Sequence, residues 1–430
     1  MRSNVRVFVV LLLSAAIMPM LSVTEVRAAT VTATNFTDRA NGACATTGAG
    51  DCTLREAVIY SNTHAATMIA LMAGVYALTI APVGTDDATS GDLNLVANVA
   101  ISGQAAGISV IDAGGMSPRD GVFKVDAGVN AALARLTIRN GHATNGGGID
   151  NLGIVALTGV SITGNVASAF GGAIYNQGTL TVDASIIGGA PPDGNTAMRG
   201  GGILSYTFDT ASALVVRNNT VILGNQAVFG NAYPDGCGGG IYSWNSQTII
   251  DGSIVGGTAP DAANVSDGCG GGIYHVDGTL MIQNGSQVLG NVAGRPGSAY
   301  HTTSGGGIDS GGTLIVSGSA INRNTASQGA GISWGGPGTI TKATIQGNVA
   351  ADSGGGIWFG GSGPDTIADS TISENTAVNG GGIYINNNGW TEPHDAPHIP
   401  AVTAVKRRTA LLHPTSGANS VGCATGSRRA

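Results

Sequence analysis

The chain has 430 residues, 71 of them glycine, and a formal net charge of −7 with only 10% of its residues charged. Such an acidic, sparsely charged chain lacks the basic surface that phosphate backbones require, which excludes nucleic acid as a partner. The glycine content excludes an α-helical solenoid, because each glycine inside a helix costs about 1 kcal/mol.

Residues 1–28 have the pattern of a secretory signal peptide. Arg2 and Arg6 precede an apolar run from Val7 to Leu21, and Val26-Arg27-Ala28 forms a cleavage site. A retained membrane anchor is the alternative, but the run is shorter than the roughly 20 residues that a span requires. We therefore expect an exported protein, extracellular or at the cell surface, with no membrane span after signal cleavage.

Residues 29–65 are predicted to form an N-terminal cap. Cys44 and Cys52 would close a small glycine-rich loop through a disulfide. Thr53 and Glu56 stand in capping-box relation at the start of a short helix, whose apolar face includes Leu54. We expect this helix to cover the open first coil of a solenoid.

The segment Asp51–Val58 reads Asp-Cys-Thr-Leu-Arg-Glu-Ala-Val and resembles the N-terminal CSLREA signature of exported bacterial repeat proteins. Threonine replaces serine at Thr53, which preserves the helix cap. The resemblance continues through residues 72–80, 91–95 and 136–141, and it covers residues 29 to about 386. It implies a right-handed β-helix outside the cell, and it implies no particular activity.

Residues 66–386 contain a landmark in which a glycine pair or near-pair precedes an isoleucine. The landmark recurs at spacings of 25, 29, 38, 32, 35, 24, 25 and 26 residues. Short strands such as Thr179–Val182 lie between the landmarks, and together these features predict an all-β parallel β-helix of about twelve coils. The isoleucines would form one inward column: Ile149, Ile174, Ile203, Ile241, Ile273, Ile308, Ile332, Ile357 and Ile383.

A second landmark runs in phase with the first and places an asparagine three positions after an aliphatic residue. Asparagine tolerates left-handed conformations and bonds to its own turn, so a stacked row predicts a ladder at a second corner. Extra residues after two of these asparagines indicate loops at Val228–Gly236 and Gly294–Thr303. Both loops follow the asparagine, so we expect insertions at one point of the coil. The predicted ladder comprises Asn165, Asn225, Asn291, Asn324, Asn348 and Asn375.

Cys237 and Cys269 each open the string Cys-Gly-Gly-Gly-Ile-Tyr and would occupy the same position on successive coils. A coil spacing of about 4.8 Å suits a disulfide, so we predict an inter-coil bridge. A column of unlinked cysteines is the alternative. Cys423 then stands alone, and no cysteine or histidine pair has the spacing of metal ligands.

The repeats are also similar to those of chlamydial polymorphic outer membrane proteins, which carry Gly-Gly-Ala-Ile and Phe-x-x-Asn motifs. Residues Gly171–Ile174 match the first motif literally, whereas the second occurs here only with Ile or Val in place of Phe. This looser resemblance also implies a right-handed β-helix at the cell surface, acting in adhesion.

The residue after each landmark isoleucine should point outward, because side chains alternate along a strand. This position presents Tyr242 and Tyr274 on consecutive coils, and Trp358 and Tyr384 on two others. Exposed aromatic columns offer faces for glycans or surface proteins, which makes these four residues the candidate ligand contacts. A stacking ladder that stabilises the sheet is the alternative.

A hydrolase of this fold requires two or three carboxylates facing one groove, and a lyase requires several aspartates converging on calcium with a lysine or arginine nearby. Asp150 and Asp309 share a register position but lie five coils apart, roughly 24 Å. Asp251 and Asp277 are the better pair. Stacked aspartates at Asp235 and Asp267 are ordinary turn residues that could also flank calcium, and we assign neither a metal, a cofactor nor a catalytic residue.

The sequence therefore predicts a secreted or surface-displayed structural and adhesive β-helix without catalysis. A polysaccharide lyase or glycosidase of the pectate-lyase-like type is the alternative. Residues 387–430 carry no landmark and contain a basic run at Lys406–Arg408, so we expect disorder there. Such an abrupt change is what a reading-frame error or a truncation produces. The ligand and the oligomeric state are left open.

Overall fold

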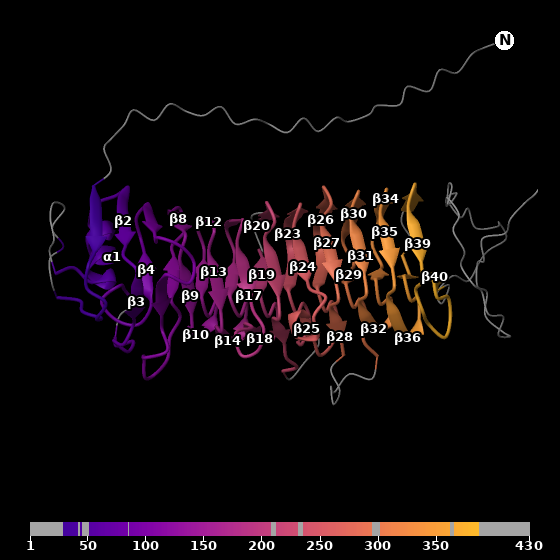
Figure 1. The fold of residues 1–430 in the computed structure, drawn as a ribbon, viewed down its shortest axis with the longest axis horizontal. Helices are drawn as coiled ribbons and strands as arrows, with labels where there is room; N and C mark the ends of the chain where they lie inside the picture. Colours follow the sequence, from indigo (N-terminus) through magenta and orange to yellow (C-terminus); the bar gives the residue numbers. More distant parts are fainter. Residues whose placement is uncertain are drawn as a thin grey trace, which may run out of the picture.

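The protein is described by a computed structural model that covers residues 29–41, 44, 51–84, 86–207, 212–230, 235–294, 302–361 and 365–386. The predicted signal peptide, the predicted tail and Cys423 lie outside the described residues. Within them, the chain winds into a right-handed parallel β-helix, in which sheets of 21, 11 and 8 strands run along one long axis (Figure 1). This confirms the predicted fold class.

Each regular coil contributes four short strands. Two of them lie in the 21-stranded sheet as parallel ladders, which become continuous where the long strands β23 and β26 cross both. The 11-stranded sheet takes one strand from each coil, in agreement with the prediction of about twelve coils.

The first ladder follows the glycine corner. It comprises β4 Leu93–Leu95, β7 Phe123–Val125, β11 Ile149–Asn151, β15 Ile174–Asn176, β19 Ile203–Tyr206, β23 Ile241–Asp251, β26 Ile273–Gln283, β29 Ile308–Ser310, β33 Ile332–Trp334, β37 Ile357–Phe359 and β40 Ile383–Ile385. The second ladder comprises β1 Thr30–Ala33, β2 Thr67–Leu71, β5 Val99–Ser102, β8 Asn130–Ala134, β12 Ile154–Thr158, β16 Thr179–Asp183, β20 Ser212–Arg217, the later halves of β23 and β26, β30 Thr313–Ser317, β34 Gly338–Thr341 and β38 Asp365–Ala368.

The two smaller sheets complete the coils. The 11-stranded sheet comprises β3 Gly74–Ala77, β6 Ser109–Asp112, β9 Thr137–Arg139, β13 Ser161–Thr163, β17 Ile186–Gly188, β21 Val221–Leu223, β24 Ile254–Gly256, β27 Gln287–Leu289, β31 Ala320–Asn322, β35 Thr344–Gln346 and β39 Thr371–Ser373. The 8-stranded sheet comprises β10 His142–Asn145, β14 Val166–Phe170, β18 Thr196–Ala197, β22 Gln226–Ala227, β25 Val265–Ser266, β28 Val292–Ala293, β32 Thr325–Gln328 and β36 Val349–Ser353.

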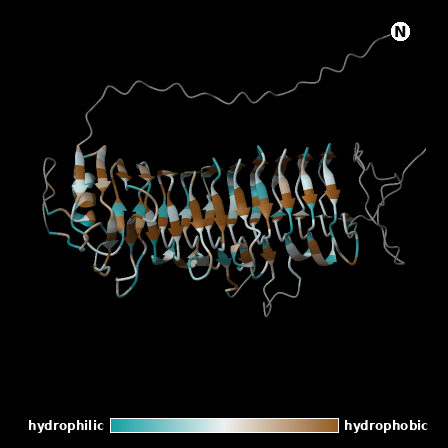
Figure 2. Ribbon diagram, viewed as in Figure 1, coloured by the Kyte–Doolittle hydropathy of each residue, from teal (hydrophilic) through white to brown (hydrophobic). Residues whose placement is uncertain are grey.

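The landmark isoleucines form the predicted inward column. Each pairs in register with the next, from Ile149 with Ile174 to Ile357 with Ile383. The first eight are fully buried, and Ile383 at the C-terminal end is partly buried. The column extends N-terminally through Phe123 and Leu93, which lack the glycine landmark. Figure 2 shows hydrophobic bands that recur along the strands, as this stacking requires.

The glycines before each isoleucine are required by the close spacing of the coils. Gly171 adopts a φ of +63°, a left-handed conformation that disfavours other residues. A Cβ atom on Gly172 would lie 2.3 Å from the carbonyl oxygen of Gly201 on the next coil. The glycine pair therefore turns the chain and allows the next backbone to approach.

The asparagine ladder is confirmed and is longer than predicted. From Asn165 to Asn348, each side-chain amide donates to the Oδ1 of the asparagine one coil further on, at 2.9–3.1 Å. Two members were missed, Asn195 and Asn264, because loops separate them from the aliphatic residue that marks the others. One of these loops contains the 3-10 helix η1 Pro260–Ala262. The idea that insertions fall at one point of the coil is therefore wrong.

A shorter polar ladder lies inside the β-helix, two residues after the anchor column. Asn151 donates to Asn176 at 2.7 Å, and Asn176 donates to Ser205 at 2.9 Å. On later coils the same column holds Ser243 and the fully buried His275, which contact each other at 3.3 Å. Burial lowers the pKa of His275 to about 4, so this ring is neutral at physiological pH.

Both predicted disulfides are present. Cys237 and Cys269 join successive coils with their Cα atoms 4.6 Å apart, and Cys44 and Cys52 are joined with theirs 5.0 Å apart. The N-terminal helix α1 Leu54–Thr63 begins with the predicted capping box between Thr53 and Glu56. The helix contacts β1, β2 and β4, so it covers the first coils at the N-terminal end of the solenoid (Figure 1).

Candidate functional site

A single outward column follows the first ladder through the described coils. Its first three positions are polar or charged, the next four hold three tyrosines and a leucine, and its C-terminal part is mixed. The register gives the column as Asn94, Lys124, Asp150, Tyr175, Leu204, Tyr242, Tyr274, Asp309, Ser333, Trp358 and Tyr384.

The expectation that Tyr242 and Tyr274 are exposed is wrong. Their exposed fractions are 2% and 8%, and their ring centroids lie 5.0 Å apart. Both rings pack in one hydrophobic cluster with the Cys237–Cys269 disulfide, so the neighbouring corner covers their outer faces. The alternative of a stacking ladder therefore describes these two tyrosines. Trp358 and Tyr384 are half-buried and stay candidate ligand contacts.

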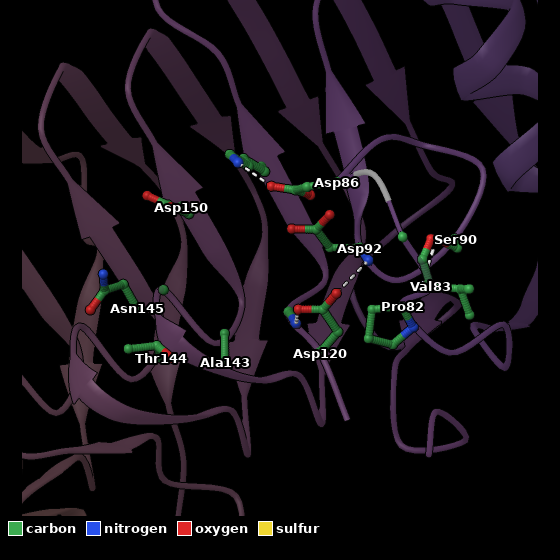
Figure 3. A pocket seen from close by; sticks show the side chains of 14 residues that line it. Pro82, Val83, Asp86, Ser90, Asp92, Asp120, Ala143, Thr144, Asn145 and Asp150 are labelled. Atoms are coloured by element: carbon green, nitrogen blue, oxygen red, sulfur yellow. Dashed lines mark hydrogen bonds and ion pairs between the residues drawn. The ribbon is translucent and has the colours of Figure 1, made fainter. Parts of the chain in front are cut away.

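The charged end of the column opens into a pocket of about 340 Å³. Four aspartates from three successive coils line this acidic pocket, together with one lysine and the polar side chains of Ser90, Thr144 and Asn145 (Figure 3). Its ionisable side chains are Asp86, Asp92, Asp120, Lys124 and Asp150.

Asp92 is the most enclosed carboxylate of the acidic pocket. Its exposed fraction is 8%, and its Oδ1 has no hydrogen-bond partner among the described residues. Burial raises the pKa of Asp92 to about 8, and the nearby carboxylates of Asp120 and Asp86 add to the shift. Asp92 is therefore a neutral carboxylic acid at pH 7, able to donate a hydrogen bond.

The other charged groups of the pocket are held differently. The ammonium of Lys124 is ion-paired with Asp86, whose Oδ1 also accepts from Asn94 at 2.9 Å. The hydrogen bond from Lys124 lowers the pKa of Asp86. Burial raises the pKa of Asp150 to about 6, and its Oδ1 is unpartnered within the described part of the chain. The pocket thus holds carboxyl groups in different protonation states.

Hydrogen bonds to the carboxylate of Asp120 connect two successive coils. Its Oδ2 accepts from the amide of Asp92 at 3.1 Å, and its Oδ1 accepts from the amide of Gly121 at 2.8 Å. Gly91 has a φ of +64°, and a Cβ atom there would lie 2.3 Å from Asp120 Oδ2. Glycine at position 91 therefore permits the contact that sets the place of Asp92.

The buried Arg55 of helix α1 fixes the loop that carries Asp92. Its guanidinium donates to the carbonyls of Ala88, Gly91 and Asp92 at 3.0, 2.8 and 3.3 Å. Its other side pairs with Asp38 at 2.7 Å, and neither side chain is exposed. The Leu-Arg-Glu part of the N-terminal octapeptide thus connects the cap to the wall of the pocket.

The carboxylate pairs singled out in the sequence do not form sites. Asp277 lies between Val276 and Gly278, which pair with Trp244 and Ser246 of the neighbouring strand β23. Asp251 lies about six residues further along that strand, which is roughly 20 Å. Asp235 is paired with Arg199 at 2.9 Å, and Asp267 accepts from the amide of Phe229 at 2.7 Å. The described residues contain no group of three His, Cys, Asp or Glu side chains arranged to hold a metal ion.

Sequence reasoning found Asp150 but missed its partners. Asp150 was compared with Asp309, and the register confirms that five coils separate them. Asp92 and Lys124 flank Leu93 and Phe123, which occupy the anchor column without the glycine landmark. Counting back from Ile149 in steps of about 26–30 residues reaches Phe123 and then Leu93. This spacing would have revealed Lys124 and Asp92 as neighbours of Asp150.

Two comparisons with known proteins give matches. Residues 159–177 and 369–386 match the Chlamydia polymorphic membrane protein repeat, and each segment includes one ladder asparagine and one glycine corner. The A-module of the Azotobacter vinelandii mannuronan C-5 epimerase AlgE6 is similar in backbone course, with a TM-score of 0.41 and 13% identity over 77% of this chain and 94% of that one. No curated protein matches the chain.

The repeat match and the two disulfides indicate an exported or outer-surface protein, because disulfides persist in oxidising compartments. Among the described residues, the longest helix is far too short to span a bilayer and no helix qualifies as a membrane span.

Proposed function

We propose that this chain is an exported, rigid β-helix at the cell surface or in the medium, and that its acidic pocket binds a carbohydrate. One observation supports this most directly. Three buried oxygens, Asp92 Oδ1, Asn145 Oδ1 and Asp150 Oδ1, line one pocket without a hydrogen-bond partner among the described residues. Buried polar groups are ordinarily satisfied, and the hydroxyl groups of a sugar would satisfy these.

Binding to a glycan array by the mature chain, with matched variants, tests this proposal. Asp92→Asn and Asp150→Asn alter the pocket with little change in shape, and we expect each to weaken binding at least tenfold. Asp251→Asn is the control, since Asp251 lies at the end of β23 and bonds to Asn284. Binding that survives both pocket substitutions would place the ligand elsewhere.

The half-buried pair Trp358 and Tyr384 is a second contact region under the same proposal. Trp358 and Tyr384 are in register on β37 and β40, near the C-terminal end of the described solenoid. Loss of array binding in Trp358→Ala, with binding retained in Asp92→Asn, would assign the ligand to this pair. The Tyr242 and Tyr274 rings are buried, so they are not proposed as contacts.

Glycoside hydrolysis is the second candidate function, and two pocket carboxyl groups with different raised pKa values favour it. A glycosidase uses one protonated acid and one carboxylate base or nucleophile. Asp92 and Asp150 would serve as acid and base, because their pKa values are raised to about 8 and about 6. Release of reducing ends from a bound glycan, abolished in both asparagine variants, would replace the non-catalytic proposal with this one.

A further inference from the structure

The charges of the acidic pocket identify the class of sugar, on the basis of the proposed carbohydrate function. Asp86 is ion-paired with Lys124. None of the ion pairs among the described residues involves Asp92, Asp120 or Asp150. Four carboxyl groups and a single cationic side chain, Lys124, thus line one pocket, and the ammonium of Lys124 is ion-paired with Asp86. Such a pocket repels anions and attracts cations.

We propose that the acidic pocket binds an amino sugar through its primary ammonium group and rejects uronic acids. The ammonium supplies three donors and one positive charge, which match the unpartnered Oδ1 atoms of Asp92 and Asp150. A uronate would place a carboxylate beside these groups, where like charges repel. The pocket is therefore selective against acidic polysaccharides.

A lysine side chain also carries an ammonium group, but the pocket wall favours a sugar. Ser90, Thr144 and Asn145 line the pocket as neutral hydrogen-bonding groups, and the Oδ1 of Asn145 lacks a partner among the described residues. The hydroxyl groups beside the amine of a pyranose would donate to such oxygens. The stem of a lysine is aliphatic and has no donor to offer them.

Binding should release a proton. At neutral pH Asp92 is protonated, and the groups that face it are Asp86, Asp120, Asp150 and Lys124. An arriving ammonium stabilises the ionised form of Asp92, so the carboxylic acid loses its proton to solvent while the amine keeps all of its own. No bond to carbon changes in this step.

Isothermal titration calorimetry on the mature chain at about pH 6 tests the inference with four probes: a glucosamine tetramer, its fully N-acetylated counterpart, a galacturonate tetramer and tetralysine. We expect the glucosamine tetramer to bind at least tenfold more tightly than each of the other three. Asp92→Asn and Asp150→Asn should each weaken it at least tenfold, whereas Asp251→Asn should not. In buffers of different ionisation enthalpy, the wild type should release more protons than Asp92→Asn, in which Asp150 is the remaining carboxyl group with a raised pKa that contacts the ammonium.

The outcomes separate this inference from the proposed function. Equal affinity for the N-acetylated tetramer would overturn the role of the ammonium and leave a carbohydrate pocket intact. Tighter binding of tetralysine would overturn the assignment to a sugar. Tighter binding of the galacturonate tetramer would overturn the charge reasoning, and binding of none of the three glycans would overturn this inference and the carbohydrate proposal together.

Discussion

Substitution of Asp92 by asparagine should stabilise the protein, although Asp92 is 8% exposed. Asparagine keeps the size of the side chain but carries no proton to lose. The folded pKa of Asp92 is about 8, compared with a value near 3.8 for a free side chain. Below the lower value both states are protonated. As pH rises toward 8, the unfolded chain ionises while the folded chain does not, so wild-type stability falls.

The size of this effect follows from the pKa difference. Each pKa unit corresponds to about 1.4 kcal/mol, so three units at pH 7 set an upper limit of about 4 kcal/mol. Water entry and relaxation around a pocket residue reduce the penalty. We expect Asp92→Asn to raise the free energy of unfolding by about 1–2 kcal/mol at pH 7.

Urea denaturation at several pH values measures this difference. The gap between variant and wild type should be near zero at about pH 3, should widen between about pH 4 and pH 8, and should stay constant above that. Asp251→Asn, at a partly exposed position outside the pocket, serves as the matched control. A destabilised Asp92→Asn at pH 7, or a gap that does not change with pH, would refute the reasoning that Asp92 is held neutral at a cost in stability.

The other predictions concern the cap, the interior and the disulfide. Arg55→Lys should destabilise the fold by about 3 kcal/mol in urea denaturation, since it breaks a buried pair and frees loop carbonyls; unchanged stability would contradict this role. His275 is buried with its pKa lowered to about 4, so stability should fall by up to about 3 kcal/mol between pH 6.5 and pH 4 and level off below. This fall should be absent in His275→Gln, and a fall of equal size there would contradict it. Asn264→Ala should cost about 3 kcal/mol in the same assay, because it leaves ladder neighbours unpaired; a loss below about 1 kcal/mol would argue against the ladder. Removal of the Cys237–Cys269 bridge, which spans 32 residues, should cost about 3–4 kcal/mol and lower the melting temperature, and an unchanged melting temperature would refute it.

The periodic pattern of the sequence was sufficient to predict that this protein is a solenoid of stacked coils. The landmark isoleucines and asparagines recur in phase, and a coil that stacks on itself must place like residues in columns. The same reasoning paired Cys237 with Cys269, because identical strings occupy identical positions on successive coils. The capping box at Thr53 could also be predicted, because it depends only on two residues three positions apart.

Only the tertiary structure decided the site. Asp92, Asp120 and Asp150 come from three coils of unequal length, and the earlier two lack the glycine landmark, so no repeat brought them into phase in the sequence. The buried state of Tyr242 was also beyond the repeat pattern, because strand alternation gives the direction of a side chain and says nothing about what packs over it. Periodic features can be read from the sequence because each coil repeats the same local contacts, whereas the pocket and the covered tyrosines depend on the irregular loops and corners between the repeats.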